Sequence, residues 1–90
     1  MQKEVILVEW EQEVVNESDF PYTVYTCEIR NKRAEIRCLD GGTGNRKYGA
    51  DILLERLVSK KLKRWEAVVD REWCGSCDEA RKIAEEWLNK

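Results

Sequence analysis

The chain has 90 residues, and its 16 Lys and Arg residues against 18 Asp and Glu residues give a net charge of −2 at pH 7. This length predicts a single domain over residues 1–90 with a small core. The charges alternate in sign along the chain, and no apolar run has the length of a membrane span or the form of a signal peptide. These features argue against a nucleic-acid or membrane-surface binder and predict a cytoplasmic protein.

The first half of the chain is predicted to be mainly β-structure. Val5 to Val8 is a short β-branched run, typical of a strand buried on both faces. Glu11 to Ser18 fits either a short helix or a structured loop. Pro21 directly precedes Tyr22 to Arg30, a run rich in Tyr, Thr and Val that predicts a second strand, and a turn leads from there to a third strand over Glu35 to Leu39.

Charge pairing gives an expected register for the hairpin formed by the second and third strands. Opposite charges stabilise an antiparallel strand pair when they lie directly across from each other. One register satisfies two such pairs on one face and places two cysteines opposite each other on the other face. Its pairs are Glu28 with Arg37, Arg30 with Glu35, Ile29 with Ile36, and Cys27 with Cys38.

The second half is predicted to contain two helices and one strand. The glycine-rich segment from Asp40 to Gly49 fits no phosphate-binding fingerprint and predicts a surface loop. The leucine spacing from Ala50 to Lys63 favours a helix with three lysines, at positions 60, 61 and 63, in its last turn. Trp65 to Asp70 predicts a fourth strand, and Asp78 to Leu88 a second helix.

Two cysteines three residues apart, Cys74 and Cys77, stand at the junction between the last strand and the last helix. A thiolate at a helix N-terminus is stabilised relative to the thiol, which makes it a nucleophile. The helix has an apolar stripe that continues back to Cys77, whereas Cys74 precedes the first turn; the stripe is Ala80, Ile83, Ala84, Trp87 and Leu88. We therefore expect Cys74 to attack and the shielded Cys77 to resolve, with Ser76 and Glu79 capping the helix.

The segment Val68-Val69-Asp70, followed by Trp73-Cys74-Gly75-X-Cys77 and an amphipathic helix, resembles the strand, active-site turn and helix of thioredoxins. With the predicted order β-(α)-β-β-α-β-α, the resemblance implies an α/β fold with a four-stranded mixed sheet. This fold is a thioredoxin-like core, circularly permuted so that the Cys-X-X-Cys unit is C-terminal. It also implies that Pro21 takes the place of the family's cis-proline beside Cys74, and that Trp73, Gly75 and Pro21 contact the substrate.

The predicted function is that of a small thiol–disulfide oxidoreductase that requires no cofactor. Its partner would be a protein or small-molecule disulfide, and neither nucleic acid nor a membrane is expected. An interaction domain without catalysis, in which the cysteines only stabilise the fold, is one alternative.

Two further alternatives follow from other residue patterns. Four thiolates suit tetrahedral zinc, so a structural zinc site is possible with Cys27, Cys38, Cys74 and Cys77 as ligands. The chain also resembles the GIY-YIG nucleases in the spacing of three elements, which are Thr23-Val24-Tyr25, Ile36-Arg37-Cys38 and Arg46. This second resemblance would imply metal-dependent DNA cleavage.

Overall fold

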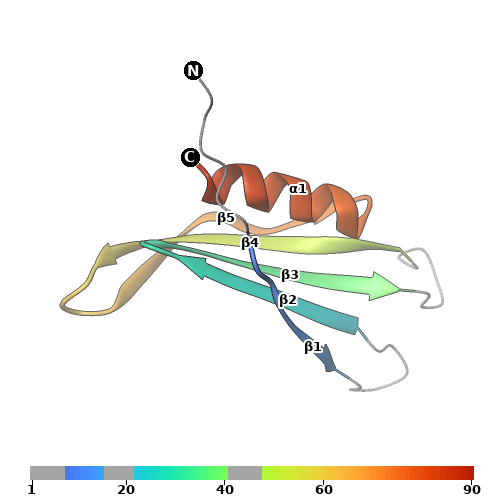
Figure 1. Cartoon of the computed structure of the whole chain (residues 1–90), viewed down its shortest axis with the longest axis horizontal. Helices are drawn as coiled ribbons and strands as arrows, with labels where there is room; N and C mark the ends of the chain where they lie inside the picture. The colour runs from blue at the N-terminus through green and yellow to red at the C-terminus, as the bar shows by residue number, and fades with distance from the viewer. Residues whose placement is uncertain (1–7, 16–21, 41–47) are drawn as a thin grey trace.

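The computed structural model describes residues 8–15, 22–40 and 48–90. These residues form a five-stranded antiparallel sheet in the order β1-β2-β3-β4-β5, followed by one helix that lies on one face of the sheet (Figure 1). The elements are β1 (Glu11–Val15), β2 (Tyr22–Ile29), β3 (Lys32–Asp40), β4 (Tyr48–Ser59), β5 (Arg64–Cys74) and α1 (Cys77–Leu88).

This architecture shows that the predicted fold class is wrong. Each strand pairs antiparallel with the next strand in the chain, so the sheet is a meander and not the mixed four-stranded α/β sheet. The permuted thioredoxin-like core is excluded as well, because it requires β2 to lie beside β5, whereas β2 lies between β1 and β3. Pro21, which that core would place beside Cys74, lies outside the described residues.

For Glu11 to Ser18, where a short helix and a structured loop were the alternatives, the described part Glu11–Val15 is instead strand β1, paired with β2. Of the first predicted strand, Val8 alone belongs to the described residues, where it has no regular structure. The second strand is confirmed as β2, and the third is confirmed with an earlier start at Lys32. The glycine-rich loop lies largely in residues 41–47, outside the described part of the chain.

The larger error concerns Ala50 to Lys63, which forms strand β4 and the following turn in place of a helix. Its leucine spacing fits a helical period, but Ala50, Ile52 and Leu54 also fit an alternating one. Neighbouring strands favour the alternating pattern, since Ile52 and Leu54 then face the core while Asp51 and Glu55 meet arginines of β3 on the other face. Tertiary packing overrides local propensity here.

The β2–β3 hairpin is shifted by four residues from its expected register. A two-residue turn, Arg30–Asn31, connects the strands, so Ile29 pairs with Lys32 and Cys27 pairs with Ala34. Cys27 and Cys38 are therefore not opposite each other. Because the shift is an even number of residues, every side chain stays on its expected face, and both cysteines point toward α1.

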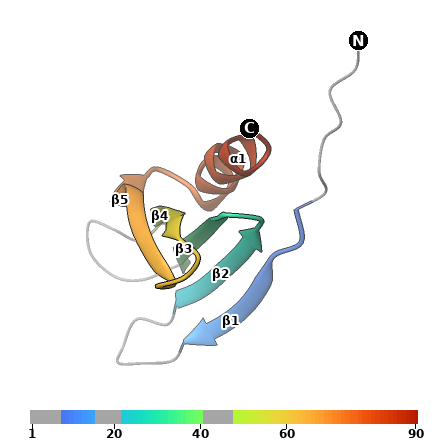
Figure 2. The same cartoon turned by 90° about the vertical axis from the view of Figure 1, so that its left-hand side faces the viewer.

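The core lies mainly between α1 and strands β3 and β4 (Figure 2). Ala80 and Ala84 are fully buried, and their small side chains let the helix approach the sheet closely over Ile36, Ile52 and Leu54. The opposite face of the sheet is not covered by any described element. No helix in the described ranges is long and apolar enough to span a lipid bilayer.

Both ends of α1 are tied down by polar contacts. Ser76 is the N-cap, and its Oγ accepts a hydrogen bond from the backbone N–H of Glu79 at 3.1 Å, as expected. At the other end, Lys32 Nζ donates to the carbonyl oxygens of Trp87 (3.0 Å) and Lys90 (2.9 Å). A cation at this position also matches the negative end of the helix dipole.

The uncovered face of the sheet is polar and is held by ion pairs across strands. Arg33 pairs with Glu55 and Arg37 with Asp51, each at 2.7 Å. Arg71 of β5 pairs with Asp51 of the neighbouring strand β4 and reaches across β4 to Glu35 of β3. This face therefore needs no covering layer to satisfy its charged groups.

Candidate functional site

The fold gathers positive charge at one end of the sheet. The turn between β2 and β3 and the turn between β4 and β5 lie at this end, and the latter has the sequence Lys60-Lys61-Leu62-Lys63-Arg64. We call this region the basic end. Its eight basic residues are Arg30, Lys32, Arg33, Arg56, Lys60, Lys61, Lys63 and Arg64, against three acidic ones, Glu28, Glu55 and Glu66.

Two contacts fix the turns of the basic end relative to each other. The backbone N–H of Leu57 donates to the carbonyl of Asn31 at 2.7 Å, which joins β4 to the β2–β3 turn. The guanidinium of Arg33 stacks on the ring of Trp65, 4.3 Å from its centroid, while its Nε donates to Glu55. The two turns thus form one surface.

Six of the eight cations are exposed and form no ion pair within the described segments; they are Arg30, Arg56, Lys60, Lys61, Lys63 and Arg64. The positive charge also affects Lys32. Burial lowers the pKa of Lys32, and repulsion from the charges of Arg56, Lys90 and Arg30 lowers this pKa further. Positive charge is therefore concentrated here and only partly compensated by the three carboxylates of the basic end.

The backbone conformation of two turn residues is a second indication that the basic end has a functional role. Arg30 (φ 57°) and Lys63 (φ 51°) have left-handed conformations, one in each turn of the basic end. Left-handed backbone costs a non-glycine residue roughly 1–2 kcal/mol, and glycine or asparagine is the usual occupant of such turn positions. Cations therefore occupy positions where glycine would be more stable.

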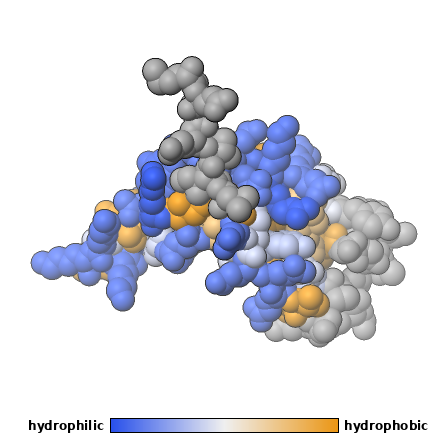
Figure 3. All heavy atoms as spheres, viewed as in Figure 1, coloured by the Kyte–Doolittle hydropathy of each residue, from blue (hydrophilic) through white to orange (hydrophobic). Residues whose placement is uncertain are grey.

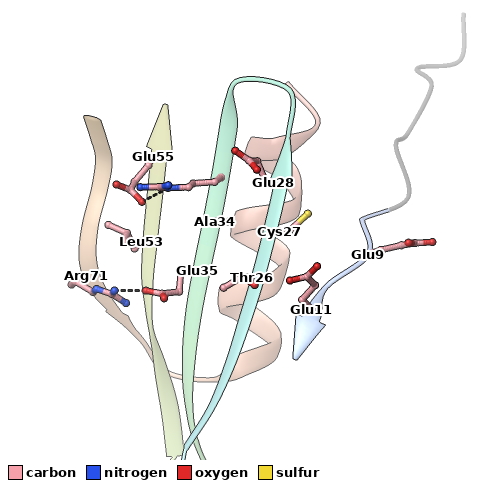
Figure 4. A pocket seen from close by; sticks show the side chains of 11 residues that line it. Glu9, Glu11, Thr26, Cys27, Glu28, Ala34, Glu35, Leu53, Glu55 and Arg71 are labelled. Atoms are coloured by element: carbon pink, nitrogen blue, oxygen red, sulfur yellow. Dashed lines mark hydrogen bonds and ion pairs between the residues drawn. The ribbon is translucent and has the colours of Figure 1, made fainter. Parts of the chain in front are cut away.

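The rest of the molecule has the opposite charge. Outside the basic end, the described segments contain twelve acidic and five basic residues. On the uncovered face, a hollow of about 770 Å³ is lined outside the basic end by Glu9, Glu11 and Glu35, against Arg71, and it extends to Glu28, Arg33 and Glu55 of the basic end (Figure 4). Figure 3 shows mainly hydrophilic side chains, with some hydrophobic ones among them, at the end of the molecule where the β4–β5 turn lies. The protein is therefore electrostatically polarised.

The Cys-X-X-Cys pair lies at the opposite end of the sheet, beneath the start of α1. Cys74 is the last residue of β5 and only 8% exposed, and Cys77 is the first residue of α1 and half-buried. Burial raises the pKa of the Cys74 thiol, and the carboxylates of Glu79 and Glu72 raise it further. The exposure expected for the two thiols is thus reversed.

Gly49 of β4 contacts both the Cys77 thiol and the side chain of Trp73. The Cys77 thiol donates a hydrogen bond to the Gly49 carbonyl, with Sγ and O 3.6 Å apart. The indole of Trp73 lies so close to Gly49 that a Cβ added there would be 2.5 Å from the ring. Of the residues expected to contact substrate, Trp73 and Gly75 therefore lie beside the pair, whereas Pro21 is outside the described residues.

The four cysteines are all thiols and do not form a zinc site. Cys38 and Cys74 both lie opposite Ala50, one on each side of β4, while Cys27 lies further along the sheet opposite Ala34. Among the described residues, no group of three or more His, Cys, Asp and Glu side chains is arranged to hold a metal ion.

The residues that resemble GIY-YIG nucleases are not brought together either. Tyr25 is on the helix side of the sheet, where its ring lies 5.5 Å from the Arg81 guanidinium. Arg37 points to the uncovered face and pairs with Asp51. Arg46 lies outside the described residues. The described part of this motif does not form a common site.

Comparisons of the chain with protein-family models, with curated proteins and with solved structures found no match. The thioredoxin resemblance is therefore confined to the local order of β5, the Cys74–Cys77 turn and α1. The basic end was missed from the sequence because its lysines were assigned to the last turn of a helix. Four cations in five positions, from Lys60 to Arg64, were the available signal.

Proposed function

We propose that the protein binds nucleic acid through the phosphate contacts of its basic end. The observation that carries this proposal is the set of six exposed cations in or near two adjoining turns, none of which forms an ion pair with another described residue, in a protein whose net charge is −2. Lysine and arginine side chains that neutralise phosphates release condensed counterions, and this release drives sequence-independent binding.

The negative charge on the rest of the described surface favours binding of the nucleic acid at the basic end. Carboxylates of the uncovered face repel a polyanion, and the acidic side chains of α1, such as Asp78 and Glu79 in its first turn, do the same on the other face. A phosphate backbone is therefore attracted to one end only. Fields of this kind steer association as well as stabilise the complex.

The first prediction concerns the dependence of binding on salt. If all six cations contact phosphates of a duplex, the logarithm of the binding constant falls with the logarithm of salt concentration with a slope of about −5. The variant Lys60→Gln/Lys61→Gln should lower the magnitude of this slope by about 2 and weaken binding about tenfold or more near 50 mM salt. Fluorescence anisotropy of labelled oligonucleotides measures both quantities.

A matched control removes two positive charges elsewhere. Arg81→Gln/Lys82→Gln changes the net charge by the same amount but acts on α1, far from the basic end. This control should bind with nearly the wild-type slope. Equal losses in both variants, or no salt-dependent binding by the wild type, would exclude the basic end as the site.

A further variant separates binding from stability. Arg30→Gly/Lys63→Gly relieves two left-handed conformations, so the free energy of unfolding should stay the same or rise by about 1 kcal/mol, while binding weakens. Reduced stability together with unchanged binding would instead indicate a purely structural role for these cations.

We also propose, as a second candidate, thiol–disulfide exchange at the Cys-X-X-Cys pair, supported by the partial exposure of Cys77 at the start of α1. The Cys77 thiolate attacks a disulfide and releases one thiolate. Cys74 then attacks Cys77 Sγ, which forms the Cys74–Cys77 disulfide and releases the second thiolate. The roles are opposite to those expected from the sequence, because Cys74 is the buried thiol.

Alkylation of the reduced protein tests this order of reactivity. Near neutral pH we expect Cys77 to react about tenfold faster than Cys74 or Cys27, since burial raises the pKa of both these thiols. A raised pKa means that thiolate forms only at higher pH, so the rates of Cys74 and Cys27 should rise last as the pH is increased. Site-resolved mass spectrometry measures the rates, and a faster Cys74 would restore the original assignment.

A further inference from the structure

Part of the basic end is a short two-stranded ribbon formed by β4 and β5 next to the turn that connects them. Pairing between β3 and β4 ends at Lys32 and Arg56, but β4 and β5 stay paired beyond it, with Leu57 opposite Trp65 and Ser59 opposite Arg64. Figure 1 shows this hairpin extending past the β2–β3 turn. Two antiparallel strands lie about 4.8 Å apart. Side chains make the ribbon wider than this backbone spacing. A two-stranded ribbon fits the major groove of B-DNA, which is about 12 Å wide, whereas the minor groove is only about 6 Å wide.

The aromatic rings that the structure describes at the basic end are already partnered by its own cations. Arg33 stacks on Trp65, 4.3 Å from the ring centroid, and Lys32 Nζ lies over the ring of Trp87 at 5.3 Å. Proteins that bind single strands combine a basic groove with exposed aromatic rings on which bases stack. These contacts favour double-stranded nucleic acid as the ligand, because its bases stay stacked on one another.

A leucine stands in the middle of the cations. Leu62 is 75% exposed, and its backbone N–H donates to Ser59 Oγ at 3.2 Å, which holds the turn in a defined conformation. Lys61 and Lys63 flank it on the turn. An exposed apolar side chain at the tip of a basic ribbon has one apolar counterpart on the edges of the bases in the major groove, the C5-methyl group of thymine.

We propose that the β4–β5 turn enters the major groove of duplex DNA, with its cations on the flanking phosphates and Leu62 against a thymine methyl group. This inference rests on the proposed nucleic-acid binding and specifies its ligand. The A-form major groove of duplex RNA is deep and narrow, so the ribbon is excluded from it.

The experiment compares duplex DNA with its thymine-free counterpart. A duplex of about two helical turns (about 20 base pairs) is prepared with thymine and, separately, with deoxyuridine, which lacks only the methyl group. Wild-type protein should bind the thymine duplex about three- to fivefold more tightly, as expected for one buried methyl group. Leu62→Ala should bind both duplexes equally, with an unchanged salt slope, because no charge is altered.

Further ligands separate this inference from the proposed function. Duplex RNA and single-stranded DNA of the same sequence should bind at least about tenfold more weakly than duplex DNA at equal salt. If either binds as tightly, or if deoxyuridine has no effect, groove entry is refuted while nucleic-acid binding stands. If no nucleic acid binds but vesicles containing phosphatidylserine do, both proposals are refuted.

Discussion

Gly49→Ala is expected to destabilise the protein by about 3–5 kcal/mol, a large part of the roughly 5–15 kcal/mol that stabilises a typical domain. Gly49 has φ 137°, a conformation that residues with a side chain rarely adopt. An added Cβ would also lie 2.5 Å from the Trp73 ring and 2.8 Å from the backbone carbonyl of Cys74. The ring can rotate away, but the carbonyl belongs to the paired strand β5 and cannot move without breaking the sheet.

Gly75→Ala is the matched control for this change. An added Cβ at Gly75 would meet only the Glu79 carboxylate, at 3.7 Å, which is ordinary van der Waals contact. Urea denaturation followed by far-UV circular dichroism gives both free energies of unfolding. Similar stabilities of the two variants would show that Trp73 and β5 do not pack on Gly49 as described.

Leu54→Ala is expected to cost about 2–5 kcal/mol, because it removes a fully buried side chain and leaves a cavity between the sheet and α1. Leu54 is 2% exposed and lies on β4 directly beneath the helix layer. The same chemical change at Leu62, which is 75% exposed, should alter the free energy of unfolding by less than about 0.5 kcal/mol.

The pair of leucine variants also tests the strand assignment of β4. If residues 50–63 formed the helix that their leucine spacing favours, Leu54 and Leu62 would lie on one face, eight residues apart, and both would be buried. Two comparable losses of stability in denaturant titrations would therefore contradict the sheet. A large loss at Leu54 alone agrees with it.

Local sequence was sufficient for the elements whose signals do not depend on distant partners. The C-terminal helix and its Ser76 cap follow from an apolar stripe and a capping side chain that act within one turn. The second strand follows from its β-branched and aromatic residues. The faces of the β2–β3 hairpin were also predictable, since alternation along a strand fixes which side chains share a face, although it does not fix the register.

Tertiary structure decided the identity of β4, the exposure of the two thiols and the existence of the basic end. The apolar run of β4 is compatible with two periods, and only β3, which offers Arg33 and Arg37 to Glu55 and Asp51, selects the strand. Cys74 is buried because the strand that ends with it is paired and covered by α1.

The distribution of charge is the property in which the linear sequence and the folded structure differ most. Along most of the sequence its sign alternates, the run from Lys60 to Arg64 excepted, and the total of −2 gives no indication of a polyanion ligand. A meander places alternate turns at the same end of the sheet, so the β2–β3 and β4–β5 turns, about thirty residues apart in the chain, become neighbours. Electrostatic potential sums over distance in space and not over separation in sequence, which is why only the folded chain has a basic end.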